Sequence, residues 1–265
     1  DYTGGGCPHI LAEPQRTNIV FPSDVAVTQT RTVTAVAYAL SFYGTGSIVL
    51  SGTHSATLTG TGVNDRVDLI FTPTAGSLVL TVSGTVTNFQ LEEGSYATSY
   101  IPTSGSTVTR NQDIFTRDGI GSLINSTEGV LFVEMAALSD DGTDRRISLN
   151  DGTVGNAINI GLSRFTGNIN GEVYSGGALQ TSGFAATGVT QTNNNKFALS
   201  WGSGTMKFYV NGSPTISITG VTSPIGLNSL KLSSGDDTLN LFAKVKQLQV
   251  YDTSLSDTQL AALTS

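Results

Sequence analysis

Acidic side chains are the first residues here that could do chemistry, because two carboxylates can share the roles of acid and base or nucleophile. Glycoside hydrolysis needs such a pair about 5–5.5 Å apart for retention or about 6.5–9.5 Å apart for inversion. Glu92 and Glu93 are adjacent, and adjacent residues of a strand point to opposite faces. Glu128 and Glu134 have no acidic residue two or four positions further on. We therefore expect no catalytic carboxylate pair and no enzymatic activity.

Nucleophilic catalysis has equally little support. The chain has two histidines, His9 and His54, and no Gly-x-Ser-x-Gly elbow that would present a serine before a helix. His54 lies among Ser, Thr and Gly residues, which indicates an exposed turn. Cys7 is the single cysteine, so it cannot form a disulfide within the chain, and we expect a structural or incidental role for it and not a reactive thiol.

The overall composition excludes two kinds of partner. Only 12% of the 265 residues are charged, against about 25% in an average soluble protein. Thirteen Lys and Arg residues and a net charge of −7 leave no basic surface for phosphates, so we expect no nucleic-acid binding. No apolar run approaches the roughly 20 residues of a membrane span, so we expect no membrane insertion. The chain begins with Asp1 instead of Met, which indicates processing or a longer protein.

Alternating side chains predict the elements that must position any site. In residues 36–42, the large apolar side chains Val36, Tyr38, Leu40 and Phe42 alternate with small ones, the pattern of a strand with one buried face. Similar runs recur about every ten residues with Gly or Pro between them, which is typical of a β-sandwich. The sequence therefore predicts an all-β protein.

The pattern breaks once, in the polar and turn-forming segment 99–113, as expected at a domain boundary. A second series of strand-like runs follows. We therefore predict two β-sandwich (jelly-roll) domains, at residues 1–112 with an extended N-terminal segment and at residues 113–265.

Two local signals in the second domain are specific. Asn211-Gly212 predicts a tight hairpin turn, because both central residues of a type I′ turn need positive φ. Ser256 followed by Gln259 is a capping box, which predicts a short C-terminal helix.

Several segments resemble segments of bacteriophage tail-fibre and other virion surface proteins. In the first half they are DYTGGGCP (residues 1–8), EPQRTN (13–18) and QLEEGSYATSYIPT (90–103). In the second half, KFYVNG (207–212) and VKQLQVYD (245–252) with LSDTQL (255–260) are similar to the central hairpin and closing strand and helix of concanavalin A-like sandwiches. The resemblance implies a carbohydrate-binding-module-like jelly roll followed by a concanavalin A-like, laminin-G-type lectin or glucanase domain.

The same resemblance implies a calcium ion as an optional ligand, and no required cofactor. Laminin-G-type domains commonly hold Ca²⁺ at the rim of the sandwich through carboxylate and carbonyl oxygens, the ligands that this hard cation prefers. In the acidic loop 140–144, Asp141 and Asp144 are the candidate ligands. Neither this loop nor Asp236-Asp237 has the spacing of an EF-hand.

Aromatic residues are the candidates for binding a sugar, since a ring can stack on the apolar face of a pyranose while amides and carboxylates bind its hydroxyls. Tyr43 and Tyr174 each end a strand-like run before a Gly-rich loop, as expected of aromatic residues at a rim. Trp201 is a third candidate, although its register with Phe197 and Leu199 favours packing in the core.

The sequence thus favours a non-enzymatic phage virion protein of the tail-fibre type that binds a host cell-surface glycan outside the cell. One alternative is a structural or decoration protein of the virion without a sugar site, and another is a glycan-degrading enzyme or its accessory module. The resemblance also implies contacts with other virion proteins and a possible homotrimer, although the chain has no heptad seam. Fold alone does not separate these functions.

Overall fold

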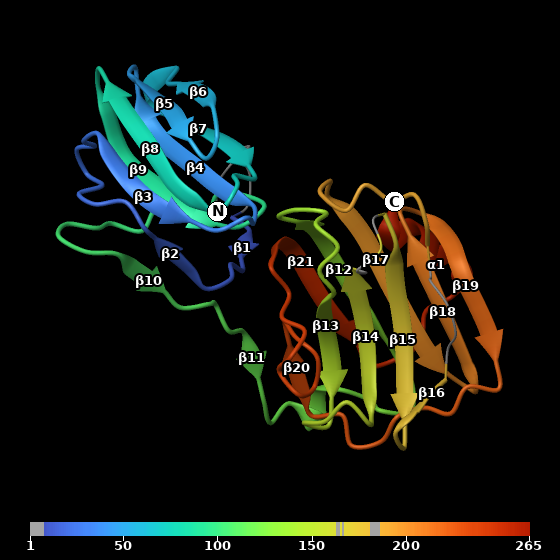
Figure 1. Ribbon diagram of the computed structural model, residues 1–265. Helices are drawn as coiled ribbons and strands as arrows, with labels where there is room; N and C mark the ends of the chain where they lie inside the picture. Colours follow the sequence, from blue (N-terminus) through green and yellow to red (C-terminus); the bar gives the residue numbers. More distant parts are fainter. Residues whose placement is uncertain (1–7, 163–164, 166, 181–185) are drawn as a thin grey trace. The chain divides into compact units, whose positions relative to one another are not determined.

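The computed structural model describes residues 8–162, 165, 167–180 and 186–265 (Figure 1). Its contacts divide the chain into two compact units. The small unit comprises Glu13–Asp113, and the large unit comprises Ile114–Ser265 together with the described residues up to Ala12. Cys7 and most of the segment 1–8 lie outside the described residues.

This division differs from the predicted one at the N-terminus. Strand β1 (Ile10–Leu11) pairs antiparallel with β21 (Ala243–Tyr251) of the large unit. The pairing continues past the strand, because Ala12 and Ala243 exchange backbone hydrogen bonds of 2.9 and 3.1 Å. The described N-terminal residues therefore supply an edge strand to the large unit. The small unit begins at Glu13, and not at residue 1 as predicted. The alternation of side chains within β1 does not indicate which strand it pairs with.

The small unit is a sandwich of antiparallel strands in the sheets β3-β8-β5-β6 and β7-β4-β9, with the separate pair β10-β2. Its strands are β2 (Arg16–Asn18), β3 (Gln29–Val33), β4 (Tyr38–Gly44), β5 (Ser47–Gly52), β6 (Ala56–Thr59), β7 (Gly62–Phe71), β8 (Gly76–Ser83), β9 (Val86–Glu93) and β10 (Val108–Arg110). Leu40 and Phe42 of β4 are fully buried in its core, as the alternation predicts. Val36 precedes the strand and is exposed.

The segments that carry the phage resemblance form a buried hydrogen-bond network in this unit. The side-chain amide of Asn18 donates to the backbone oxygen of Ile101 at 2.9 Å. The buried carboxylate of Glu92 accepts hydrogen bonds from the backbone nitrogen and the hydroxyl of Thr98, at 2.7 and 2.6 Å. These bonds hold the irregular segment 95–103 against the sandwich. The most distinctive motif residues therefore stabilise the fold.

The large unit consists of two six-stranded antiparallel sheets, β1-β21-β12-β17-β18-β19 and β11-β20-β13-β14-β15-β16. In Figure 1 the sheet with β13, β14 and β15 lies in front of the sheet with β12, β17 and β18. Its remaining elements are β11 (Thr116–Arg117), η1 (Gly121–Leu123), β12 (Gly129–Ala137), β13 (Arg145–Asn150), β14 (Ala157–Leu162), β15 (Ile169–Ser175), β16 (Ala178–Leu179), β17 (Asn195–Gly202), β18 (Thr205–Val210), β19 (Ser213–Thr219), β20 (Ser229–Lys231) and the helix α1 (Asp257–Thr264).

Trp201 packs in the core between these two sheets and is only 1% exposed. It lies opposite Gly129 on the neighbouring strand, and a Cβ at Gly129 would come within 2.6 Å of the indole ring. The glycine therefore leaves the space that the ring fills. This confirms the core packing that its register with Phe197 and Leu199 favours. It also removes Trp201 from the candidates for sugar stacking, because a ring with no exposed face cannot reach a ligand.

Both local signals of the second domain are confirmed. Asn211 and Gly212 have φ values of 48° and 81° and connect β18 to β19. Ser256 and Gln259 form the reciprocal bonds of a capping box at the start of α1. Leu260 of this helix is fully buried against the sheet.

The architecture confirms the predicted fold class, an all-β protein of antiparallel sandwiches with one short C-terminal helix. Within the described ranges, no helix has the length and apolar character that crossing a membrane requires.

Candidate functional site

A polar surface covers the outer side of the sheet that contains β13, β14 and β15. Along these strands, aliphatic residues of the core alternate with polar residues, so the polar residues share one side. Strand pairing aligns the residues of this side in three rows, which together we call the polar face although they include Gly161 and Ala157. The rows are Arg146, Gly161 and Asn170; Lys231, Ser148, Asn159 and Glu172; and Ser229, Asn150, Ala157 and Tyr174.

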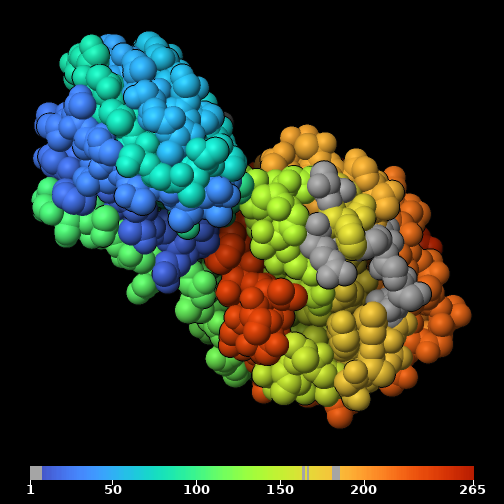
Figure 2. All heavy atoms as spheres, in the orientation of Figure 1, coloured from blue at the N-terminus to red at the C-terminus, as the bar shows by residue number. Residues whose placement is uncertain are grey.

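Residues 232–239, the covering loop, close part of the polar face. The hydroxyl of Ser148 donates to the backbone oxygen of Ser233 at 2.7 Å. The ammonium of Lys231 donates to the backbone oxygen of Gly235 at 3.0 Å and to Asp237 at 2.9 Å. In Figure 2 the orange-red atoms of this part of the chain lie against yellow-green atoms of the β13 region. The covering loop thus provides hydrogen-bond partners for Ser148 and Lys231 on one side of the polar face. On the other side, next to Tyr174, it leaves a pocket.

The pocket has a volume of about 230 Å³. It is lined by Arg146, Val154, Asn159, Tyr174, Ser234, Asp236, Thr238 and Leu239. Asn159 is 4% exposed, yet its Oδ1 accepts no hydrogen bond from the described part of the chain. Among the same residues, Nε of Arg146 also has no hydrogen-bond partner. Because buried polar atoms are normally paired, Oδ1 of Asn159 marks a position where a water or a ligand could donate a hydrogen bond.

Ion pairs fix the charged side chains around this pocket. The guanidinium of Arg146 donates through Nη1 to Glu172, and its Nη2 lies 3.9 Å from Asp144. Burial raises the pKa of the Glu172 carboxyl above its ordinary value, although Arg146 and a hydrogen bond from Asn159 oppose the shift. Hydrogen bonds from Ser234 and Thr238 hold the pKa of Asp236 below its ordinary value. Of these four charged groups, Arg146 and Asp236 line the pocket, whereas Glu172 and Asp144 are the ion-pair partners of Arg146.

Of the predicted aromatic residues, Tyr174 lines this pocket, half-buried at the end of the third row. Tyr43 lies half-buried on β4 of the small unit, where its strand neighbours are Arg66 and Thr87. The 390 Å³ cavity of that unit is lined by Gln15, Arg16, Thr17, Ile19 and Glu93, and so does not include Tyr43.

The predicted calcium ligands do not combine into a site. Asp141 accepts a hydrogen bond of 2.5 Å from the buried guanidinium of Arg145, and Asp144 lies beside Arg146. Each aspartate therefore faces an arginine, which would repel a cation held there. Across the described ranges, no three His, Cys, Asp or Glu side chains gather in a way that could hold a metal ion. The residues present do not fit a Ca²⁺ ion at these positions.

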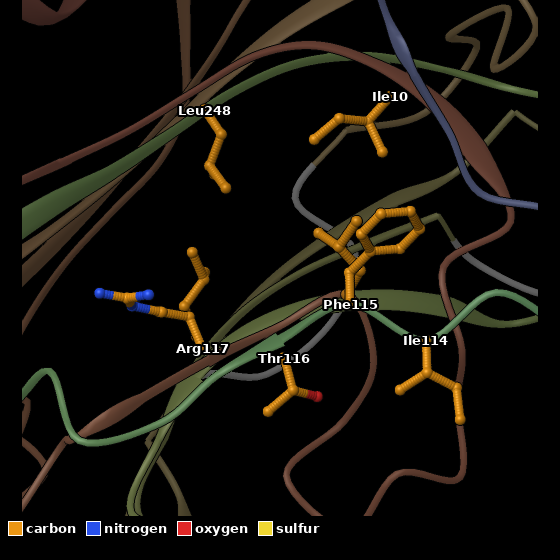
Figure 3. Close-up of a pocket in the computed structure, with 8 residues that line it drawn as sticks. Ile10, Ile114, Phe115, Thr116, Arg117 and Leu248 are labelled. Carbon is orange, nitrogen blue, oxygen red and sulfur yellow. The ribbon is translucent and has the colours of Figure 1, made fainter.

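A second cavity in the large unit has a different chemistry. It measures about 300 Å³ and is lined by Ile10, Ile114, Phe115, Thr116, Arg117, Leu230, Leu232 and Leu248. Figure 3 shows Phe115 with Ile10 and Leu248 above it, side chains from three distant parts of the sequence. Six of these eight residues are apolar, and only Thr116 and Arg117 could replace the hydrogen bonds that a sugar loses to water, so this cavity suits a carbohydrate poorly.

Arg146, Asn159 and Glu172 are not among the site residues predicted from the sequence. The available signal was the alternation of polar with aliphatic residues in RRISLN (145–150), AINIGL (157–162) and INGEVYS (169–175). This alternation predicts a polar side for each strand, but strand order and register are needed to bring these three residues together.

Neither a family model nor a curated protein sequence matches the chain. Among solved structures, it is similar to the CBM40 module of the Ruminococcus gnavus IT-sialidase, bound in that structure to α2,3-sialyllactose, with 17% identity and a TM-score of 0.46 over 57% of this chain and 98% of that one. The NanB sialidase of Streptococcus pneumoniae has 18% identity and a TM-score of 0.47, over 57% of this chain and 27% of that one. A heptameric pentraxin from Limulus polyphemus has 13% identity and a TM-score of 0.42, over 53% of this chain and 70% of that one. At these values the likeness concerns architecture, and no ligand is transferred from it.

Proposed function

We propose that this chain is a non-enzymatic carbohydrate-binding protein, and that the pocket on the polar face of its large unit holds the sugar. The observation that carries the proposal is the buried Oδ1 of Asn159, which has no partner in the described chain and lies in a pocket with an aromatic ring. A sugar presents the two surfaces that such a pocket can meet. Its hydroxyls replace the missing hydrogen bonds, and its apolar C–H face packs on the ring.

Each lining residue has a distinct task in this proposal. Tyr174 provides the aromatic surface and sits at the edge of the pocket, where a ring remains accessible to a ligand. Asn159 accepts a hydrogen bond from a hydroxyl, and Arg146 donates one through Nε. The ion pair of Arg146 with Glu172 keeps the guanidinium in place, so little side-chain entropy is lost when a sugar binds.

We further propose that the protein is an extracellular component of a phage virion that binds host-surface glycans and contacts other virion proteins. The support is the resemblance of EPQRTN (13–18) and QLEEGSYATSYIPT (90–103) to segments of phage tail-fibre proteins. Purified phage particles would test this part, since the chain should be detected among their proteins by mass spectrometry. Its absence from particles that contain all the other tail and capsid proteins would contradict the proposal.

The second candidate is a structural protein of the virion without a sugar site. The apolar cavity favours it, because Ile114 and Phe115 are 71% and 37% exposed beside that cavity and could pack against another protein. Under this alternative, the chain attaches to phage particles but binds no glycan.

Replacing Tyr174 tests the sugar site. Tyr174→Ala removes the aromatic surface, and we expect at least tenfold weaker binding, or about 1.4 kcal/mol. The measurement is a glycan array to identify ligands, followed by calorimetric titration of the full chain with the strongest of them.

Tyr43→Ala is the matched control, because it removes the other rim tyrosine from the small unit. We expect it to leave affinity unchanged. Equal loss in both variants, or none in Tyr174→Ala, would show that the sugar binds elsewhere. Unchanged circular dichroism and melting temperature would show that each variant is folded.

A further inference from the structure

The charges around the pocket also bear on which sugars it takes. Building on the function proposed above, we propose that this pocket selects neutral sugars and rejects the corresponding sugar acids, such as uronic and sialic acids. Three features carry the proposal: the engagement of Arg146, the acidic rim, and the neutral polar atoms that remain free.

Among the residues that the structure describes, Arg146 is the only cationic one that lines the pocket. A guanidinium recognises a carboxylate best through two parallel N–H bonds. In this protein Nη1 of Arg146 already bonds Glu172, and Nη2 lies near Asp144. A sugar carboxylate would therefore compete with two protein carboxyl groups for one cation, and it would have to leave its own water shell.

The rim of the pocket adds a further negative charge. Asp236 lines it and accepts hydrogen bonds of 2.6 and 2.8 Å from the hydroxyls of Ser234 and Thr238, which stabilise the ionised carboxylate. The neighbouring cation Lys231 cannot offset this charge, since its ammonium is bound to Asp237 and to the backbone oxygen of Gly235. Because Arg146 is paired with Glu172, the uncompensated charge among the described lining residues is the carboxylate of Asp236, which repels an anion.

What remains free in the pocket is suited to hydroxyls. Oδ1 of Asn159 is an acceptor and needs an O–H or N–H donor, whereas a deprotonated carboxylate can only accept. The ring of Tyr174 requires an apolar surface. A neutral hexose provides both. Its acid counterpart adds a negative charge, and the cation among the described lining residues, Arg146, is already paired with Glu172 and has only Nε left without a partner.

Matched sugar pairs test this selectivity. Glucose with glucuronate, galactose with galacturonate, and lactose with 3′-sialyllactose compare a neutral sugar with an acidic counterpart. The full chain is titrated with oligosaccharides that carry each pair, at low and at physiological salt. We expect the neutral member of the bound pair to bind at least tenfold more tightly at low salt. The ratio should fall as salt rises, because salt screens repulsion between exposed charges.

Asp236→Asn keeps the size of the side chain but removes its charge. It should therefore reduce the ratio of the affinity for the neutral sugar to that for the acidic sugar by about two- to fivefold at low salt. Asp24→Asn changes the net charge equally at an exposed position of the small unit, and it should leave the ratio unchanged. Equal narrowing in both variants would assign the effect to net charge and overturn the proposal.

The outcomes separate this proposal from the one on which it rests. If acidic sugars bind as tightly as neutral ones and Tyr174→Ala abolishes both, the sugar site stands and the selectivity is wrong. If neither member of any pair binds, the carbohydrate-binding function itself fails, and the selectivity fails with it.

Discussion

Glu172 is a carboxyl group that the fold places away from water, on the polar face between Asn159 and the guanidinium of Arg146. Burial disfavours its charged form more than these two partners favour it, and its pKa is raised as a result. In the unfolded chain the same carboxyl titrates near the ordinary value of about 4.3. The folded protein therefore binds this proton more tightly than the unfolded chain does.

Glu172→Gln tests this effect. In the wild type, the contribution of Glu172 to the free energy of unfolding is greatest at pH values below the ordinary pKa of the carboxyl. It decreases as pH rises through the raised pKa of the folded state. Glutamine does not titrate, so the stability of the wild type relative to the variant should decrease as the pH rises above about 4, the ordinary pKa of the carboxyl. Urea unfolding of both proteins, followed by tryptophan fluorescence at several pH values, measures this difference in stability. A relative stability that increases over this range would contradict the raised pKa.

Among the elements, β9 and the irregular segment 95–103 show how motif residues stabilise the small unit. Glu92 of β9 is fully buried and accepts hydrogen bonds from Thr98 and from the side chain of Gln90. Its neighbour Glu93 is exposed and bonds to the hydroxyl of Tyr38 at 2.8 Å. Adjacent residues with the same side chain thus differ in burial, as expected for opposite faces of a strand.

Glu92→Ala should destabilise the small unit by about 2–4 kcal/mol, because it leaves several buried donors without an acceptor. Glu93→Ala should cost less than about 1 kcal/mol, since water can replace the lost partner at an exposed position. Hydrogen exchange at the amide of Thr98 gives a local measurement, and we expect faster exchange in Glu92→Ala only. Equal destabilisation by both substitutions would argue against the buried network.

At the scale of the whole molecule, the two units are not simply consecutive stretches of sequence. Strand β1 belongs to the large unit, although the entire small unit separates it in sequence from the rest of that unit. Trp201 is the single tryptophan of the chain and lies in the core of the large unit. Tryptophan fluorescence therefore reports the unfolding of the large unit specifically.

Deleting residues 1–12 should destabilise the large unit by about 1–3 kcal/mol, because it removes the backbone hydrogen bonds between β1 and β21. We expect the unfolding midpoint by tryptophan fluorescence to decrease. The calorimetric transition of the small unit should stay unchanged. A fluorescence midpoint equal to that of the full chain would show that β1 contributes nothing to the large unit.

Local patterns in the sequence were sufficient to determine the class of fold and several of its details. The alternation around Leu40 and Phe42, the turn at Asn211-Gly212 and the capping box at Ser256 all depend on residues a few positions apart, and the structure contains each of them. Side-chain alternation and turn geometry are properties of the local backbone, so a sequence can reveal them directly.

Only the tertiary structure decided which faces are covered and which residues meet. Alternation places Trp201 on one side of its strand, but the packing of two sheets buries that side completely. Arg146, Asn159 and Glu172 come from three strands, and their grouping depends on strand order and register. The covering loop then determines which part of the polar face remains a pocket. These contacts join residues far apart in the sequence, and their free energy depends on the packing of the whole unit.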